Sequence, residues 1–131
     1  MKVTQASGTR KRAIARATLR QGTGKITING VDLQNVTPEF VRLKIMEPLA
    51  LAKDVAGKCD VAVLVQGGGI IGQADAVRLA IARALSEQSP KLKELFLKYD
   101  RHLIVADVRQ RESRKPNTHG NARGKVQKSY R

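Results

Sequence analysis

The hydrophobic and polar positions along the chain predict short strands and longer helices. Residues 10–20 alternate between apolar and basic positions, as a half-buried strand does. One face of this predicted strand carries small or aliphatic side chains, at Ala13, Ala15, Ala17 and Leu19. The other face carries arginines, at Arg10, Arg12, Arg16 and Arg20. The pattern indicates either a row of positive charge on a rigid element or an edge strand that uses charge to resist aggregation.

A second strand and a helix are expected next. Residues 26–28 carry two isoleucines and precede an Asn-Gly turn, which is typical of a meander. Thr37 and Pro38 predict a helix start, because a hydroxyl caps the helix and proline suits its first turn. We expect Pro48 to interrupt this helix, with a second short helical piece after it. Its apolar positions are Phe40, Val41, Leu43 and Ile45.

The second half of the chain predicts two more strands and two more helices. Residues 61–65 are a continuous apolar run of β-branched character, which predicts a strand covered on both faces. Residues 102–106 predict the last strand. Apolar residues at helical spacing predict one helix through Ala74, Val77, Ile81, Ala84 and Leu85 and another through Leu92, Leu95, Phe96 and Tyr99, whose side chains should lie in the core. This mixture predicts an α+β domain with helices packed on a sheet.

Positive charge is concentrated at the two ends of the chain. The 131 residues carry 25 Lys and Arg against 11 Asp and Glu, a net charge of +14. Residues 1–20 hold six basic and no acidic residues, residues 21–108 hold 11 basic and 10 acidic, and residues 109–131 hold eight basic and one acidic. An excess confined to two segments predicts a polyanionic partner, and nucleic acid is the expected polyanion.

The last segment differs from the rest in apolar content as well. From residue 109 to 131, only Val126 and Tyr130 offer sizeable apolar groups. Their burial cannot offset the entropy of ordering the segment. We therefore expect a globular domain over residues 1–108 and an extended basic tail over residues 109–131 that is disordered when free.

A glycine motif lies between a predicted strand and a predicted helix. Gly67, Gly69 and Gly72 spell G-x-G-x-x-G, which in dinucleotide-binding enzymes follows the first strand and precedes a ribose-binding acid about 20 residues on. Here at least two strands come first, and the acids at that distance lie in or near helices. Two interpretations remain open: a helix N-terminus that binds an RNA phosphate, or a turn that packs closely against a neighbour.

No group of residues predicts an enzyme or a cofactor. His102 and His119 have no catalytic partner nearby in sequence, and His102 is expected in the core. Cys59 is expected to be a small core residue, and nothing predicts a metal site. The chain has no apolar run of membrane-spanning length and no secretory signal, so we expect a cytoplasmic protein with no membrane and no small-molecule substrate. Capping or turn roles are expected for Asp60, Asp75, Asp100 and Asp107.

Six stretches along nearly the whole chain resemble one family. They are GTRKRAIAR (8–16), GTGKITING (22–30), MEPLALA (46–52), GGGIIGQADA (67–76), YDRHLIVAD (99–107) and the terminal QKSYR. Together and in this order they resemble the ninth protein of the small ribosomal subunit. The QADA continuation and the QKSYR ending are similar to the archaeal branch of that family.

The resemblance implies a fold and a location in the ribosome. The fold would be a two-layer α+β domain, with a four-stranded sheet and helices as in domain 2 of ribosomal protein S-five, plus the basic tail. The protein would be a structural constituent of the small-subunit head, on ribosomal RNA and beside neighbouring small-subunit proteins. Its tail would reach the transfer RNA in the peptidyl site through Lys128, Ser129, Tyr130 and Arg131. The alternative is a tail that only fills RNA crevices.

We expect RNA contacts from both charged segments and from the glycine turn. The candidate residues are Arg10, Lys11, Arg12, Arg16, Arg20, Gly67, Gly68, Gly69, Gln73, Arg109, Arg111, Arg114, Lys115, Arg123 and Lys125. Two other interpretations stay open beside the ribosomal one. They are a generic basic nucleic-acid binder such as a chromatin protein, and a nucleotide-dependent enzyme.

Overall fold

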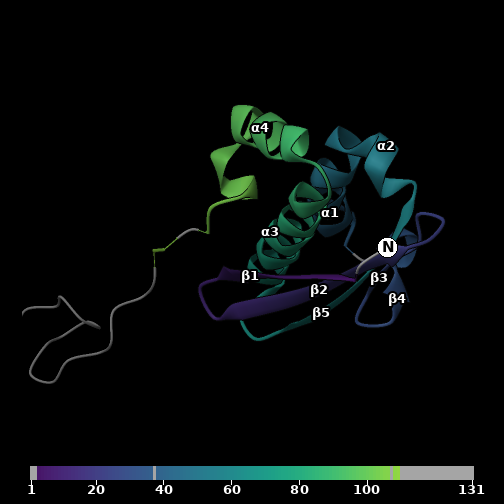
Figure 1. Ribbon diagram of the computed structural model, residues 1–131. Coiled ribbons are helices and arrows are strands. Elements are labelled where there is room, and N and C mark those ends of the chain that lie inside the picture. Colours follow the sequence, from purple (N-terminus) through teal and green to yellow (C-terminus); the bar gives the residue numbers. More distant parts are fainter. Residues whose placement is uncertain (1–2, 37, 107, 110–131) are drawn as a thin grey trace, which may run out of the picture.

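One mixed sheet organises the described part of the chain. Figure 1 shows the computed structural model, which describes residues 3–36, 38–106 and 108–109. Among these residues the sheet has five strands in the order β1-β2-β5-β3-β4, and only the pair β3 and β5 is parallel. The strands are β1 (Thr4–Arg10), β2 (Ala13–Gln21), β3 (Ile26–Ile28), β4 (Val31–Asp32) and β5 (Cys59–Gln66).

The helices all lie on one side of this sheet (Figure 1). Helix α3 packs on β1 and β2, α1 packs beside α3, and α4 packs on α3 farther from the sheet. The chain between the parallel strands β3 and β5 crosses over through α1, as a parallel pair requires. The elements are α1 (Glu39–Leu51), α2 (Lys53–Ala56), α3 (Ile70–Gln88), α4 (Pro90–Tyr99) and two 3₁₀ turns, η1 (Leu33–Asn35) and η2 (Arg101–Leu103). The predicted α+β class is confirmed.

Small residues allow α3 to lie close to the sheet. Three of the inward residues of β2 are alanines, and the buried face of α3 that packs on them also carries several alanines. The closest approach is at Gly8 on β1, where an added Cβ would lie 2.4 Å from the carbonyl oxygen of Ala76 and 2.7 Å from the amide nitrogen of Ala80. Only glycine therefore fits between this strand and this helix. The inward alternation predicted for β2 is confirmed.

Larger side chains fill the core around this contact. Phe96 of α4 and Leu103 of η2 are fully buried. Cys59 is buried as predicted, and burial together with the neighbouring Asp60 charge raises the pKa of its thiol. A raised thiol pKa keeps the group protonated and unreactive at neutral pH. Other large buried side chains include Leu19, Ile45, Ile81 and Leu85.

The last strand predicted from the sequence is not formed. Residues 102–106 do not form a strand: the Asp100 carboxylate accepts the His102 backbone N–H at 3.0 Å and starts the turn η2 instead. The edge position beside β2 belongs to β1, which pairs with it along its whole length. Four strands were expected and three of them are present, whereas β1 and the two-residue β4 were not expected.

Two further expectations about the helices are wrong. Pro48 does not interrupt α1, which continues to Leu51, because the proline ring is buried and its packing offsets the backbone hydrogen bond it cannot form. In α4, Leu92 and Phe96 are buried as predicted, whereas Leu95 and Tyr99 are 40% and 58% exposed. Helix α4 packs on α3, η2 and α1 from its inner side only, so it buries a narrower stripe than the sequence pattern predicts.

Candidate nucleic-acid interface

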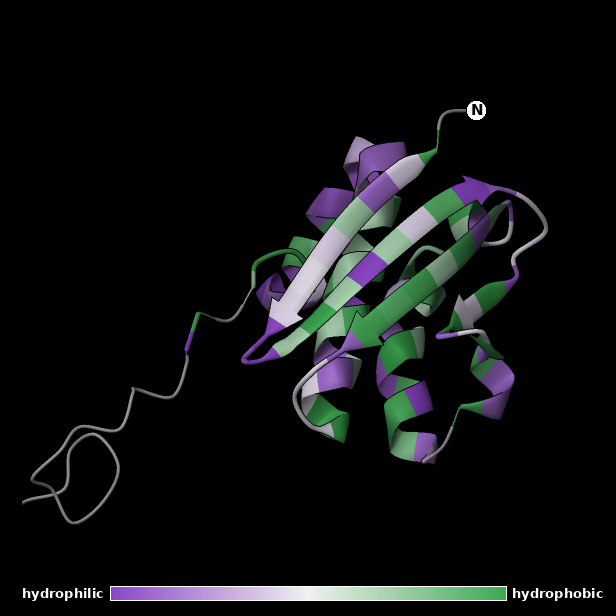
Figure 2. Cartoon of the chain, turned by 90° about the horizontal axis from the view of Figure 1, so that it is seen from below, coloured by the Kyte–Doolittle hydropathy of each residue, from purple (hydrophilic) through white to green (hydrophobic). Residues whose placement is uncertain are grey.

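The face of the sheet opposite the helices is open. Figure 2 views the molecule from this side, with the strands in front of the helices. Strand β5 was predicted to be covered on both faces, but Leu64 is 66% exposed because no described element packs over it. A continuous apolar run does not reveal which of its alternate residues face a helix. The open face is therefore a surface that is free to meet a partner.

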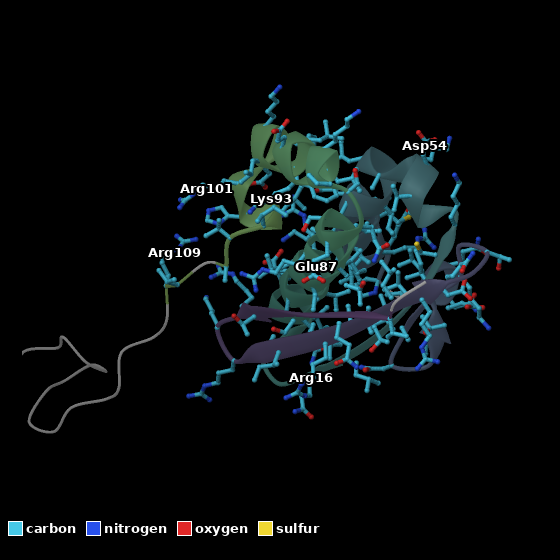
Figure 3. The ribbon with its side chains drawn as sticks, in the orientation of Figure 1. Arg16, Asp54, Glu87, Lys93, Arg101 and Arg109 are labelled. Carbon is cyan, nitrogen blue, oxygen red and sulfur yellow. The ribbon has the colours of Figure 1, made fainter. Side chains whose placement is uncertain are left out.

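The arginines of β2 project from this open face. Arg16 and Arg20 are exposed, and the strand register places Arg16 between Ser7 of β1 and Leu64 of β5. Figure 3 shows Arg16 pointing away from the helices. Because β2 lies between β1 and β5, it is a central strand, so protection of an edge against aggregation does not explain its arginines.

Two more cations extend this row at the β1–β2 turn. Lys11 and Arg12 form the turn and are exposed, with Lys11 in the left-handed region at φ 54°. Arg10 was predicted on the same face, and that expectation is wrong. The chain reverses at Lys11 and Arg12, so Arg10 ends β1 opposite the buried Ala13 and faces α3. Its Nε lies 3.7 Å from the carboxylate of Asp75 on α3.

The acidic residue nearest to the arginine row is held by the backbone. Asp60 is the register partner of Arg20, and its carboxylate accepts N–H groups of Lys25 and Thr23, both at 3.0 Å. These hydrogen bonds hold the pKa of Asp60 below its ordinary value. The predicted turn role of Asp60 is confirmed. Lys11, Arg12, Arg16 and Arg20 thus outnumber the one carboxylate in their row.

The glycine turn packs against the basic hairpin turn. Gly67 and Gly68 have φ angles of 81° and 67°, and a Cβ on Gly67 would lie 2.5 Å from the carbonyl oxygen of Arg12. A Cβ on Gly68 would lie 3.0 Å from the Ala13 nitrogen. The close-packing interpretation of the glycines is therefore confirmed for these two positions. The same contact brings the glycine turn beside Lys11 and Arg12.

The N-terminus of α3 begins in this turn. Gly69 is its N-cap, with open space where a side chain would be. The backbone N–H of Gln73 donates a helical hydrogen bond to the Gly69 carbonyl at 2.9 Å. N–H groups before that point have no acceptor within an α-helix. The first turn of α3 also carries no acidic residue. Gln73, a predicted RNA contact, donates its side-chain amide to the Gly67 carbonyl at 3.1 Å and so closes the turn.

A second group of charges lies on the helical side and is internally paired. Arg78 on α3 is buried and binds Glu47 of α1 and Asp100 at the end of α4. Burial would raise the pKa of Asp100, but the His102 N–H and the Arg78 guanidinium hold it below its ordinary value. The Asp75 carboxylate lies 2.7 Å from the Lys44 ammonium and also binds Arg10. Asp75 therefore forms ion pairs from the middle of α3 and does not cap a helix.

These paired charges line a cleft of about 520 Å³. Tyr99, His102 and Arg109 also border it. His102 was expected in the core but is exposed, because η2 replaces the strand in which it would have been buried. Arg109 is exposed at this cleft rather than on the open sheet face. The cleft lies among β1, α1, α3 and α4. Its carboxylates, Glu47, Asp75 and Asp100, neutralise the cations to which they bind.

The other tail candidates lie outside the described residues. They are Arg111, Arg114, Lys115, Arg123, Lys125, Lys128, Ser129, Tyr130 and Arg131, together with His119. Asp107 also lies outside them. Within the described ranges, no group of three or more His, Cys, Asp or Glu side chains is placed to hold a metal ion. No helix in that part of the chain combines the length and apolar character needed to cross a bilayer.

Comparison with known proteins decides between the three interpretations. Residues 8–131 match the family model of ribosomal protein S9/S16. The chain belongs to the ribosomal protein S9/S16 family. It is 50% identical over 133 residues to small ribosomal subunit protein uS9 of Methanothrix thermoacetophila. It is 46% identical over 134 residues to the uS9 proteins of Methanococcus vannielii and Methanococcus maripaludis, and all three alignments cover 100% of both chains.

Membership of the S9/S16 family assigns the chain to the ribosome. As an S9/S16 protein it is a structural constituent of the small ribosomal subunit in the cytoplasm, and it is not an enzyme. The resemblance to archaeal relatives expected from the sequence is confirmed. The interpretations as a chromatin-like binder and as a nucleotide-dependent enzyme are set aside. Partners in the subunit are ribosomal RNA and other ribosomal proteins.

Proposed function

We propose that this S9/S16 protein binds small-subunit ribosomal RNA through the basic strip, which we define as Lys11, Arg12, Arg16 and Arg20. The supporting observation is that Arg16 and Arg20 are exposed on the open face of a central strand, that Lys11 and Arg12 are exposed in the turn before it, and that one carboxylate, Asp60, lies in this row. Cations on a rigid strand bind phosphates without a further cost for ordering the backbone. The glycine turn and the N-terminus of α3 extend the same surface with backbone N–H donors.

Helix α4 carries the strongest competing surface. Lys91, Lys93 and Lys98 lie on it, but Glu94 lies among them on the same short helix. Flexible lysines beside a carboxylate are less suited to bind a phosphate than arginines in a fixed row. We therefore favour the basic strip as the RNA surface. An exposed α4 that faces solvent explains the lysines equally well.

Ultraviolet crosslinking of the purified small subunit tests this proposal. Peptides that contain residues 11–20 should carry RNA adducts, and peptides of residues 91–98 should carry far fewer. The α4 peptides are an internal control, because both segments are exposed and basic. Adducts mainly on residues 91–98, with none on residues 11–20, would show that RNA lies on the other side of the protein.

The basic tail is proposed to meet the transfer RNA in the peptidyl site. Residues 109–131 carry eight basic and one acidic residue, and a cationic strand of this kind orders against phosphates and releases counterions. Tyr130 can stack on a base or ribose and Arg131 can bind a phosphate with two hydrogen bonds. The tail would otherwise fill RNA crevices within the subunit.

Deleting residues 128–131 should weaken transfer RNA binding without preventing assembly. We expect normal incorporation into subunits and a loss on the order of 10-fold in peptidyl-site affinity, because two cations and one stacking ring are removed. Filter binding to purified subunits measures this loss. The double variant Lys128→Ala/Arg131→Ala keeps the chain length and should show most of it. Unchanged binding in both variants would leave the tail with a role in RNA packing alone.

A further inference from the structure

Helix α1 carries apolar side chains on two opposite faces. Its inner face buries Val41 and Ile45 against the core. Its outer face presents Phe40, Leu43 and Met46, which are 53%, 54% and 42% exposed. Residues spaced by three along a helix lie on one stripe, so these three form a continuous apolar surface, the outer α1 stripe. A helix that is apolar on both faces is normally covered on both.

A groove adjoins the outer α1 stripe. It has a volume of about 550 Å³ and lies between α1 and the segment of residues 24–34. Its apolar walls are Ile26, Leu33, Leu43 and Met46. Val31 of β4 adds another exposed apolar side chain in the adjoining segment, at 45%. A groove of this kind can hold an aliphatic or aromatic side chain of a partner.

The charges around the groove favour a protein over RNA. Arg42 is engaged within the chain, 3.5 Å from the Glu39 carboxylate and donating to the Gln34 carbonyl at 3.2 Å. The other charged side chains that line the groove, Lys25 and Asp32, are of opposite sign. RNA is held by uncompensated cations, which the basic strip offers and this surface does not. An apolar stripe with a charge-balanced rim is instead typical of a protein interface.

We infer that the outer α1 stripe and its groove form an interface with another protein of the small subunit, which inserts an apolar side chain into the groove. This inference rests on membership of the S9/S16 family and not on the RNA contacts proposed above. A second copy of the chain is a poor partner, because each copy carries a net charge of +14 and the two would repel.

A photo-crosslinker placed on the stripe identifies the occupant. p-Benzoylphenylalanine in place of Phe40 keeps an aromatic ring at a position that does not line the groove. In purified small subunits it should attach mainly to another small-subunit protein, whereas the same group in place of Leu97 on α4, which is 42% exposed, should attach far less. Adducts mainly to RNA or to a second copy of the chain would overturn the inference. Equal yields from the two positions, or none from position 40, would overturn it too.

A charge placed on the outer α1 stripe tests whether the stripe contributes to binding of the neighbouring protein. Met46 and Leu97 are both 42% exposed, so Met46→Glu and Leu97→Glu make a matched pair. Both free proteins should unfold at the wild-type temperature. In assembled subunits, Met46→Glu should reduce retention of the crosslinked neighbour by about 10-fold or more, and Leu97→Glu should leave it unchanged. Equal retention in the two variants would overturn the inference.

Discussion

Replacing Gly8 by valine should lower the free energy of unfolding by about 3 kcal/mol. The first added atom would lie 2.4 Å from a backbone oxygen of α3 and 2.7 Å from a backbone nitrogen, so no rotamer avoids the overlap. The helix must move away from β1 or the strand must leave the sheet. Either movement opens the contact that buries the small residues of both elements. For a domain of this size the thermal midpoint should fall by about 10 °C or more.

Ser7→Val is the matched control for this substitution. Ser7 directly precedes Gly8 on β1, but its side chain is exposed on the open face of the sheet. Valine is a strong strand former, so at position 7 it should change the free energy of unfolding by no more than about 0.5 kcal/mol. Calorimetry or urea unfolding of the two free proteins measures the difference. Equal stabilities would mean that α3 does not rest on β1 at Gly8.

Strand β1 is an element that the sequence pattern did not predict. Strand β2 could be predicted because its small inward residues alternate with outward positions that are polar or charged except at Ile14, and the structure keeps that alternation. Strand β1 could not, since TQASGTR contains no large apolar residue. Its inward positions include Thr4 and Gly8, which are small because α3 lies directly above them. Close packing removes the hydrophobic signal by which a strand is recognised. Residues 102–106 had that signal, yet the Asp100 side chain turned the chain instead.

The candidate interface was predictable in its chemistry and less so in its geometry. The sequence showed that Arg16 and Arg20 share a face, because strand alternation fixes that relation locally. It did not show that Arg10 faces the helices, since that depends on where the hairpin reverses. The exposure of Leu64 and Leu43 was also hidden. Leu64 lies in an apolar run and Leu43 among the apolar positions of a helix, and only tertiary packing decides which of these residues are covered.

Reversing the charges of the basic strip should cause the largest loss of RNA binding. In Arg16→Glu/Arg20→Glu, two expected phosphate contacts become repulsive, and affinity for naked small-subunit RNA should fall on the order of 100-fold near physiological salt. The slope of log affinity against log salt should become shallower by about 1.4 to 1.8, the share of two phosphates. The domain should remain folded, because both side chains are exposed on the open face and the repulsion between a carboxylate at position 20 and Asp60 should cost at most about 1 kcal/mol. Filter binding across a salt series gives both quantities.

Position, rather than total charge, is what this experiment isolates. Lys53→Glu/Lys93→Glu changes the net charge by the same amount, but its residues lie on α2 and α4, on the helical side of the molecule. If RNA lies on the basic strip, this control should lose little affinity and keep the wild-type slope, since long-range attraction is screened within about 10 Å at these salt concentrations. If both double variants weaken binding equally, the field of a +14 protein accounts for binding, and the order of the arginines on β2 has no part in it. A rigid row predicts the opposite result, because a central strand fixes the backbone positions from which both arginines extend.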